Sequence, residues 1–105
     1  MKTKDIKTID VITKCWFDKI NGNTYFAQRI TINRGLKTET MLVNHFQYGY
    51  SSYDHYAKKF VKESLNLKCD IVNDYNLCSY NGKIKFHNEV IKNCKKRDLH
   101  NIGMF

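Results

Sequence analysis

The sequence predicts one α+β domain: an antiparallel sheet of four or five strands, in the order β-β-β-α-β, with one main helix on one face. Two observations predict this class. Apolar and polar residues alternate with a period of two along three segments in the first half of the chain. A segment with apolar residues at helical spacing follows them. The chain has 105 residues, enough for one modest core, so we expect a single domain over residues 1–105.

The first strand is predicted to start at Asp10, because residues 1–8 are polar and basic and are expected to fray. Alternation places Val11 and Cys15 on one face of this strand and Trp16 on the other. The strand therefore has an amphipathic pattern with an unusual tryptophan on its more polar face.

Two turn signals divide the first half of the chain into three strands. Asn21-Gly22 is typical of a two-residue hairpin, because both central residues of a type I′ turn need a positive φ. Asn33-Arg34-Gly35 is the second signal. The second and third strands are then expected at 25–32 and 38–47, joined to the first as an antiparallel meander.

A helix is predicted from Ser51 to Leu65 or Leu67. Ser51 and Asp54 stand three residues apart, as in a capping box. Apolar residues then recur at helical spacing, with lysines filling the opposite side.

The last third of the chain is less regular. A short strand is expected around Ile71-Val72, and a turn follows at residues 80–83. Residues 84–94 alternate as a strand does, although Val90, Ile91 and Cys94 also fit one face of a helix. We favour a strand, because turn residues precede it and β-branched residues populate it.

The four cysteines indicate free thiols in a reducing compartment. Cys15, Cys69, Cys78 and Cys94 form no C-x-x-C pair and match no zinc spacing, although Cys69 and Cys78 would pair if a loop closed between them. The amino terminus has no apolar core of a signal peptide, and no apolar run approaches a membrane span. We therefore expect a cytoplasmic protein with no metal, no cofactor and no membrane contact.

The charge balance predicts an anionic partner. The chain has 18 basic and 10 acidic residues and a net charge of +8, which favours nucleic acid, a nucleotide or an acidic protein face. The alternative is compositional, since chains rich in Lys, Asn, Ile and Tyr are typical of AT-rich genomes. No Walker loop, nucleophile elbow or H-E-x-x-H motif is present, so no catalytic residue is predicted and an enzyme is not expected.

The first candidate site is a cluster of tyrosines and serines at the predicted helix start. A helix amino terminus presents free N–H groups that suit a phosphate, and tyrosines stack on bases. The alternative is that these tyrosines belong to the core. The candidate ligand-binding residues of this cluster are Tyr48, Tyr50, Ser51, Ser52 and Tyr53.

The second candidate site is a lysine-rich stripe near the carboxyl end. Residues 83–97 contain six basic side chains and one acid, a pattern that attracts phosphate backbones without reading base sequence. The alternative is a solvated surface. The basic residues of the stripe are Lys83, Lys85, Lys92, Lys95, Lys96 and Arg97.

The patterning also predicts a homo-oligomer, with a dimer favoured. Both faces of the predicted sheet are half apolar, and one helix covers only one of them, so the other face suits an interface. Trp16 and Arg29 are the candidate interface residues. The alternative is that residues 1–8 and 102–105 fold back over the open face.

Residues 16–25, WFDKINGNTY, resemble a family of small phage and prophage proteins with a W-F-x-x-x-N-G-N-T-Y hairpin. The likeness continues through Tyr48-Gly49-Tyr50 to a basic close at Lys96-Arg97-Asp98, and Ser51 stands where the pattern has a second glycine. The resemblance implies a phage accessory protein that acts on its host.

Two functions follow as hypotheses. The first is a non-enzymatic binding module for an anionic nucleic-acid-like ligand: DNA, RNA or a signalling nucleotide. The alternative is a protein-binding inhibitor of a host defence or nucleic-acid-processing enzyme.

Overall fold

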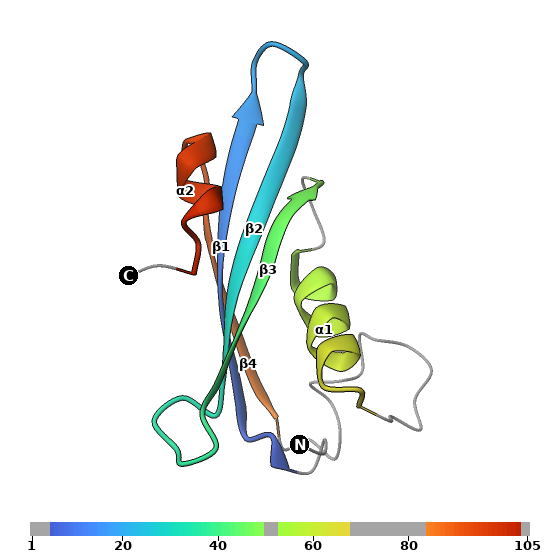
Figure 1. The fold of residues 1–105 in the computed structure, drawn as a ribbon, viewed down its shortest axis with the longest axis vertical. Helices are drawn as coiled ribbons and strands as arrows, with labels where there is room; N and C mark the ends of the chain where they lie inside the picture. Colours follow the sequence, from blue (N-terminus) through green and yellow to red (C-terminus); the bar gives the residue numbers. More distant parts are fainter. Residues whose placement is uncertain (1–4, 50–52, 68–83, 104–105) are drawn as a thin grey trace.

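The computed structural model describes residues 5–49, 53–67 and 84–103, and it confirms the α+β class (Figure 1). The described part of the chain forms one four-stranded sheet and two helices. Their bounds are β1 (Thr8–Asp18), β2 (Asn23–Ile32), β3 (Thr40–Tyr48), α1 (Tyr53–Ser64), β4 (Lys85–Ile91) and α2 (Lys96–His100).

The strand order is β3-β2-β1-β4, and the sheet is mixed. β1, β2 and β3 form the predicted antiparallel meander. β4 pairs in parallel with β1, so the antiparallel expectation is wrong for this strand. The physical reason is the connection. β3 and β4 lie at opposite edges of the sheet with α1 between them in the chain, and strands joined by such a crossover run parallel. β4 therefore runs in the direction of β3, which is also the direction of β1. The strand expected at Ile71-Val72 lies outside the described residues, as do Cys69 and Cys78.

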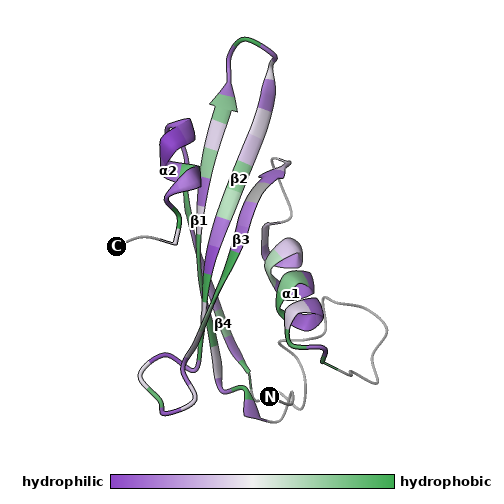
Figure 2. Cartoon of the chain, in the orientation of Figure 1, coloured by the Kyte–Doolittle hydropathy of each residue, from purple (hydrophilic) through white to green (hydrophobic). Residues whose placement is uncertain are grey.

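α1 covers one face of the sheet, and the larger core lies between them. The apolar segments of β1, β2 and α1 meet there (Figure 2). Each of the central strands contributes alternate residues, as the period of two predicted. The buried members include Ile9, Val11, Ile30, Ile32 and Val61.

The second face of the sheet is partly covered by α2, which the sequence did not lead us to expect (Figure 1). Leu99 and Ile102 are buried against Ala27, with Val43 and Trp16 packed around them. The main helix, α1, lies on one face as predicted, and the short α2 adds unexpected cover on the other. Ile102 follows the alternative in which the tail folds back. α2 and Ile102 cover part of the apolar face from which the homo-oligomer was predicted, so less of that face is left for an interface. The oligomer stays a prediction.

The packed structure begins before β1, which corrects the expectation that residues 1–8 fray. Ile6 is buried in the α1-side core. The Lys7 backbone N–H donates to Asn33 Oδ1 at 2.6 Å, and Asn33 Nδ2 donates to the Asp5 carbonyl at 2.9 Å. Residues 1–4 lie outside the described part.

The first hairpin is present, but its loop is longer than predicted. Asp18 pairs with Asn23, which leaves four residues in the loop. Gly22 has a φ of 70°, while Asn21 is not among the residues with positive φ, so the turn is not type I′. The Asp18 carboxylate stabilises the four-residue loop, because it accepts hydrogen bonds from the backbone N–H of Ile20 at 3.0 Å and from the Asn21 side-chain amide at 2.8 Å.

A row of polar side chains crosses the buried face of the sheet beneath the start of α1. Asn44 Nδ2 donates to Gln28 Oε1 at 3.1 Å, and Gln28 Nε2 donates to Thr13 Oγ1 at 3.2 Å. Thr13 Oγ1 donates in turn to Asn88 Oδ1 at 2.9 Å. Gln28 Nε2 also donates to the Tyr53 carbonyl at 2.8 Å. The row links all four strands and fixes the first turn of α1 to them.

Residues 84–94 resolve the strand-or-helix alternative in favour of a strand. β4 ends at Ile91, so Cys94 lies beyond it. Asn93, with a φ of 62°, turns the chain back, and the Cys94 N–H donates to the Cys15 carbonyl at 2.9 Å. This turn brings α2 onto the second face of the sheet.

Candidate nucleic-acid interface

An aromatic row crosses three strands on the face that α2 shares. The strand register places Trp16 beside Tyr25, and Tyr25 beside Tyr48. The Trp16 and Tyr25 ring centroids lie 5.6 Å apart and nearly parallel, while Tyr25 and Tyr48 meet edge to face at 5.6 Å. Tyr48 is 64% exposed, so the row ends at solvent.

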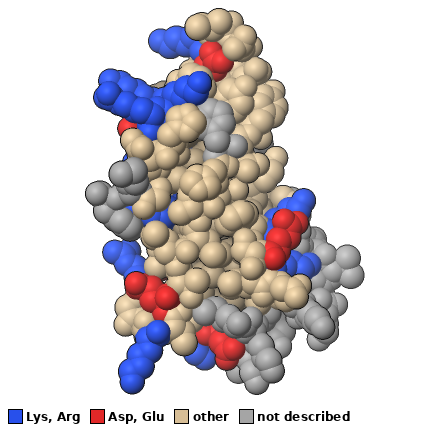
Figure 3. All heavy atoms as spheres, in the orientation of Figure 1, with Lys and Arg blue, Asp and Glu red and all other residues tan. Residues whose placement is uncertain are grey.

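Basic side chains lie beside this row. Lys95, Lys96 and Arg97 are exposed at the start of α2, and Figure 3 shows a dense group of cationic side chains on this part of the molecule. The Lys96 ammonium lies 5.7 Å from the centroid of the Trp16 ring, within the range of a cation–π contact. The return of the chain after Asn93 produces this arrangement, because it places α2 over β1.

The acids nearest to these cations are occupied by other groups. Asp98 Oδ2 accepts the Lys95 backbone N–H at 2.8 Å. The hydrogen bond from the Asn21 side chain holds the pKa of Asp18 below its ordinary value, which keeps that carboxylate ionised within its loop. Both acids therefore bind local groups, and the ionised Asp18 also interacts electrostatically with Lys96. The exposed cations Lys19, Lys95, Lys96 and Arg97 outnumber these two acids.

A hollow of about 490 Å³ opens beside Trp16, between the end of β1 and the chain that leads into α2. Lys19 and Lys95 line it, and so does Ile20, which is 93% exposed at the hairpin tip. Phe17 lies on its rim and is 52% exposed. Exposed apolar side chains next to cations are typical of a binding surface. We call this group the aromatic–basic surface; it consists of Trp16, Phe17, Lys19, Ile20, Tyr25, Tyr48, Lys95, Lys96 and Arg97. Lys92 lines a separate hollow with Cys15 and Tyr53 on the α1 side.

The structure separates Tyr48 from Tyr53, which the sequence placed in one cluster. Tyr53 lies on the α1 side, where its ring packs edge to face on Phe26 with centroids 5.0 Å apart. This placement follows the alternative in which Tyr53 belongs to the core. Tyr50, Ser51 and Ser52 lie outside the described residues.

The lysine stripe is also divided. Lys85 pairs with Thr8 at the start of β1, whereas Cys94 bonds Cys15 near its end. Seven residues of strand separate the two positions, roughly 23 Å at about 3.3 Å per residue. Lys85 is therefore remote from Lys92 and α2, and Lys83 lies outside the described residues. Arg29 shares the face of Trp16 but lies in a second hollow, described below.

Tyr25, Phe17 and Lys19 are members of this surface that the sequence reading missed. Tyr25 was treated only as a strand residue, although it closes the motif in which Trp16 is the first residue. The signal that finds it is the cross-strand register, because aromatic neighbours on adjacent strands stack when they face each other.

On the α1 side of the sheet, the buried Cys15 pairs with the partly buried Tyr53. Burial raises the pKa of the Cys15 thiol above its ordinary value, and burial together with the hydrogen bond to Cys15 raises the pKa of Tyr53 well above the usual range. Both groups are thus neutral at pH 7. Cys15 and Cys94 are free thiols, as predicted for these two cysteines.

We expect the protein to lose stability at alkaline pH because of this pair. A group whose pKa is raised by folding stabilises the folded state below its unfolded pKa, and that stabilisation is lost as pH rises. The free energy of unfolding should therefore fall above about pH 9, the ordinary pKa of a cysteine. Urea titrations between pH 7 and 11 measure this. Tyr53→Phe should make the decline shallower than in the parent protein; an equally steep decline would contradict the assignment.

Within the described residues, no group of three or more His, Cys, Asp and Glu side chains is placed to hold a metal ion. None of the helices in the same part of the chain has the length and apolar character needed to cross a membrane.

Comparison with known proteins adds no assignment to this geometry. The resemblance to small phage proteins stays a prediction from residues 16–25 and the segments after them. No protein-family model, curated protein or solved structure matches the chain, so its function is argued from its own residues.

Proposed function

We propose that this protein is a non-enzymatic binding module for an anionic nucleic-acid-like ligand, and that the aromatic–basic surface is its binding site. The ligand class is DNA, RNA or a signalling nucleotide. One observation carries the proposal: an ammonium group, Lys96, lies over the inner end of an aromatic row whose outer end, Tyr48, is exposed.

The chemistry of the surface fits both parts of such a ligand. Phosphates are attracted by Lys19, Lys95, Lys96 and Arg97, which are all exposed. Bases stack on aromatic rings, and each stacked base contributes about 1–3 kcal/mol in proteins that bind single strands. A surface that combines the two favours an unpaired strand or a free nucleotide, because the faces of paired bases are already stacked on one another.

Fluorescence anisotropy with labelled oligonucleotides tests the proposal. We expect single-stranded DNA or RNA to bind more tightly than a duplex of the same sequence, with an affinity that falls as salt rises. Tyr48→Ala should weaken binding about tenfold, since one stacking contact of about 1–3 kcal/mol is lost. Lys96→Gln should weaken it and also lower the dependence on salt. Unlabelled cyclic nucleotides, added as competitors, report whether a small ligand suffices.

Lys85→Gln is the matched control. It makes the same change of charge at an exposed lysine, but at the other end of β1. If Lys85→Gln weakened binding as much as Lys96→Gln, the net charge alone would attract the ligand and the surface would not be a site. If no oligonucleotide or nucleotide bound at low salt, the proposal would be wrong.

The second candidate is inhibition of a host defence or nucleic-acid-processing enzyme by direct protein contact. The exposed Ile20 and Phe17 favour it, because apolar side chains beside cations suit a protein interface as well. Loss of binding to every nucleic-acid probe would make this the leading candidate. In both forms the protein acts as a phage-type accessory factor in the host cytoplasm, which is part of the proposal.

A further inference from the structure

A second hollow lies on the same face of the sheet, at the end away from α2's basic residues, and the proposed function does not use it. Its volume is about 510 Å³, within the range of small-molecule sites. Two rows of paired residues form its floor. Arg29, Ile12 and Glu89 lie side by side on β2, β1 and β4.

Thr31, Asp10 and His87 lie side by side in the neighbouring row, again on β2, β1 and β4. Met41 continues this row on β3 and is 45% exposed. The lining therefore combines a small apolar floor, supplied by Ile12 and Met41, with charged groups on both sides.

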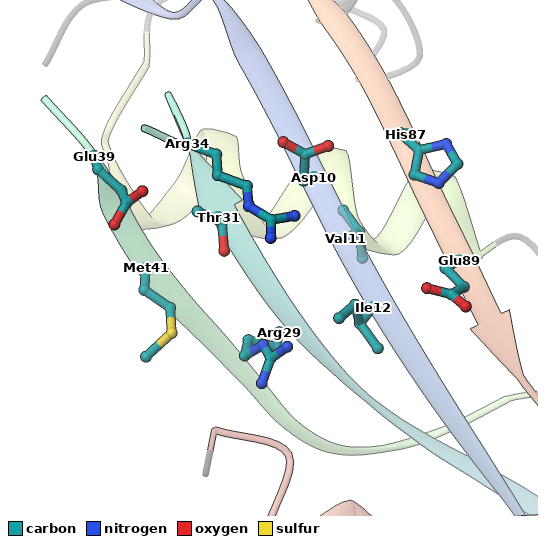
Figure 4. Close-up of a pocket in the computed structure, with 10 residues that line it drawn as sticks. All are labelled: Asp10, Val11, Ile12, Arg29, Thr31, Arg34, Glu39, Met41, His87 and Glu89. Atoms are coloured by element: carbon teal, nitrogen blue, oxygen red, sulfur yellow. The ribbon is translucent and has the colours of Figure 1, made fainter. Parts of the chain in front are cut away.

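The charges are segregated by strand. Arg29 and, from the β2–β3 loop, Arg34 stand on the β2 side, and Figure 4 shows the Arg34 guanidinium extending over Thr31 toward β1. Asp10 and Glu89 stand on the β1 and β4 side. Glu39 also borders the basic side, but its carboxylate accepts the Gly35 backbone N–H at 2.7 Å. The β2 side of the hollow thus carries two guanidinium groups and the carboxylate of Glu39, whereas the β1 and β4 side carries two carboxylates and, among the described lining residues, no Lys or Arg.

We infer that this hollow binds a small zwitterionic ligand of the peptide or amino-acid class. Its carboxylate lies against Arg29, Arg34 and the Thr31 hydroxyl, since guanidinium groups match carboxylates in a bidentate manner. Its ammonium group lies against Glu89 and Asp10. The binding needs no change in the fold and no contact with α2, so it is independent of the nucleic-acid proposal.

The spacing of the strands sets the length of the ligand. Neighbouring strands lie about 4.8 Å apart, so β2 and β4 are separated by roughly 10 Å. An extended peptide spans about 3.3–3.6 Å per residue. A tripeptide therefore reaches from the Arg29 side to the Glu89 side, whereas a single amino acid does not.

Triglycine is the probe that tests this inference, with backbone amide chemical shifts as the measurement. We expect triglycine to shift amides of β1, β2 and β4 around the hollow in a saturable manner. N-acetyl-triglycine and triglycine amide, which each lack one charge, should bind at least tenfold more weakly, and glycine should bind weakly as well. Equal binding of the blocked peptides, or no shift at millimolar triglycine, would overturn the inference.

Two variants assign the ends of the ligand. Arg29→Gln should weaken triglycine more than triglycine amide and so reduce the difference in affinity between them, because one of the two guanidinium partners of the carboxylate is gone. Glu89→Gln should do the same for triglycine and its N-acetyl form. Lys59→Gln on α1, an exposed residue on the opposite side of the sheet, is the control and should bind as the parent does. A well-dispersed spectrum for each variant shows that it is folded, and unchanged triglycine binding by folded Arg29→Gln and Glu89→Gln would contradict the site.

Discussion

Replacement of Asn33 by alanine is expected to lower the free energy of unfolding by about 3–4 kcal/mol. The Asn33 side chain is completely buried and makes four hydrogen bonds. Oδ1 accepts the backbone N–H groups of Lys7 and Thr8, at 2.6 and 3.4 Å. Nδ2 donates to the Asp5 carbonyl and to Thr38 Oγ1, both at 2.9 Å. Truncation removes these four partly buried hydrogen bonds, each of which contributes about 0.5–1.5 kcal/mol.

The backbone adds to this effect. Asn33 has a φ of 56°, in the left-handed region that asparagine tolerates better than alanine. Placing alanine in this conformation costs roughly 1 kcal/mol. Asn33→Gly separates the two contributions, because glycine adopts this conformation freely but makes none of the side-chain bonds.

Asn66→Ala is the matched control for Asn33→Ala. Asn66 also has a positive φ, 51°, but its side chain is exposed. Urea denaturation should show a loss of about 1 kcal/mol or less for Asn66→Ala. If both alanine variants lost the same stability, the hydrogen bonds of Asn33 would contribute nothing, and its role as the link between residues 5–8 and the β2–β3 loop would be wrong.

The alternation of side chains was sufficient to predict the three meander strands and their faces. Val11 and Cys15 face α1, and Trp16 faces away, as their spacing in β1 requires. The partners across the strands were not predictable in this way. A two-residue turn at Asn21-Gly22 pairs Trp16 with Ala27, whereas the four-residue loop that Asp18 stabilises pairs it with Tyr25. The aromatic row was missed for this reason.

The direction of β4 and the position of α2 depend on contacts that are distant in sequence. β4 is an edge strand with mostly exposed side chains, so its own alternation does not distinguish a parallel from an antiparallel partner. α2 has only five residues, and its core contribution comes from Leu99 and from Ile102 just beyond it. Too few apolar positions are present for a helical period to be recognised.

The candidate site was predicted in part, because composition identified its chemistry and not its geometry. Lys92, Lys95, Lys96 and Arg97 belong to the predicted basic stripe, and they lie between the end of β4 and the first turn of α2, with Lys92 on the α1 side of the sheet. Lys85 was grouped with them because it is near in sequence, but a strand rises about 3.3 Å per residue and carries it away. The tyrosines were separated for a different reason: Tyr48 ends a strand on one face, and α1 starts on the other.

Replacement of Gln28 by methionine is expected to lower the free energy of unfolding by about 2–4 kcal/mol. Gln28 is completely buried at the centre of the polar row beneath α1. Methionine has a similar shape, so little cavity forms, but Asn44 Nδ2 and the Tyr53 carbonyl lose their partner. Each such buried polar group costs about 1–3 kcal/mol.

Two further variants distinguish lost hydrogen bonds from general sensitivity of the row. Gln47→Met changes an exposed glutamine that also bonds Asn44, and surface changes of this kind are usually within about 0.5 kcal/mol of the parent. The double variant Gln28→Met, Asn44→Leu also removes the Asn44 side-chain amide, which Gln28→Met alone leaves without its acceptor. It should therefore be more stable than Gln28→Met alone in urea denaturation.

Amide hydrogen exchange in the first turn of α1 should quicken in Gln28→Met, because the Tyr53 carbonyl anchors that turn to β2. Unchanged exchange there, with unchanged stability, would show that the row does not hold α1 on the sheet.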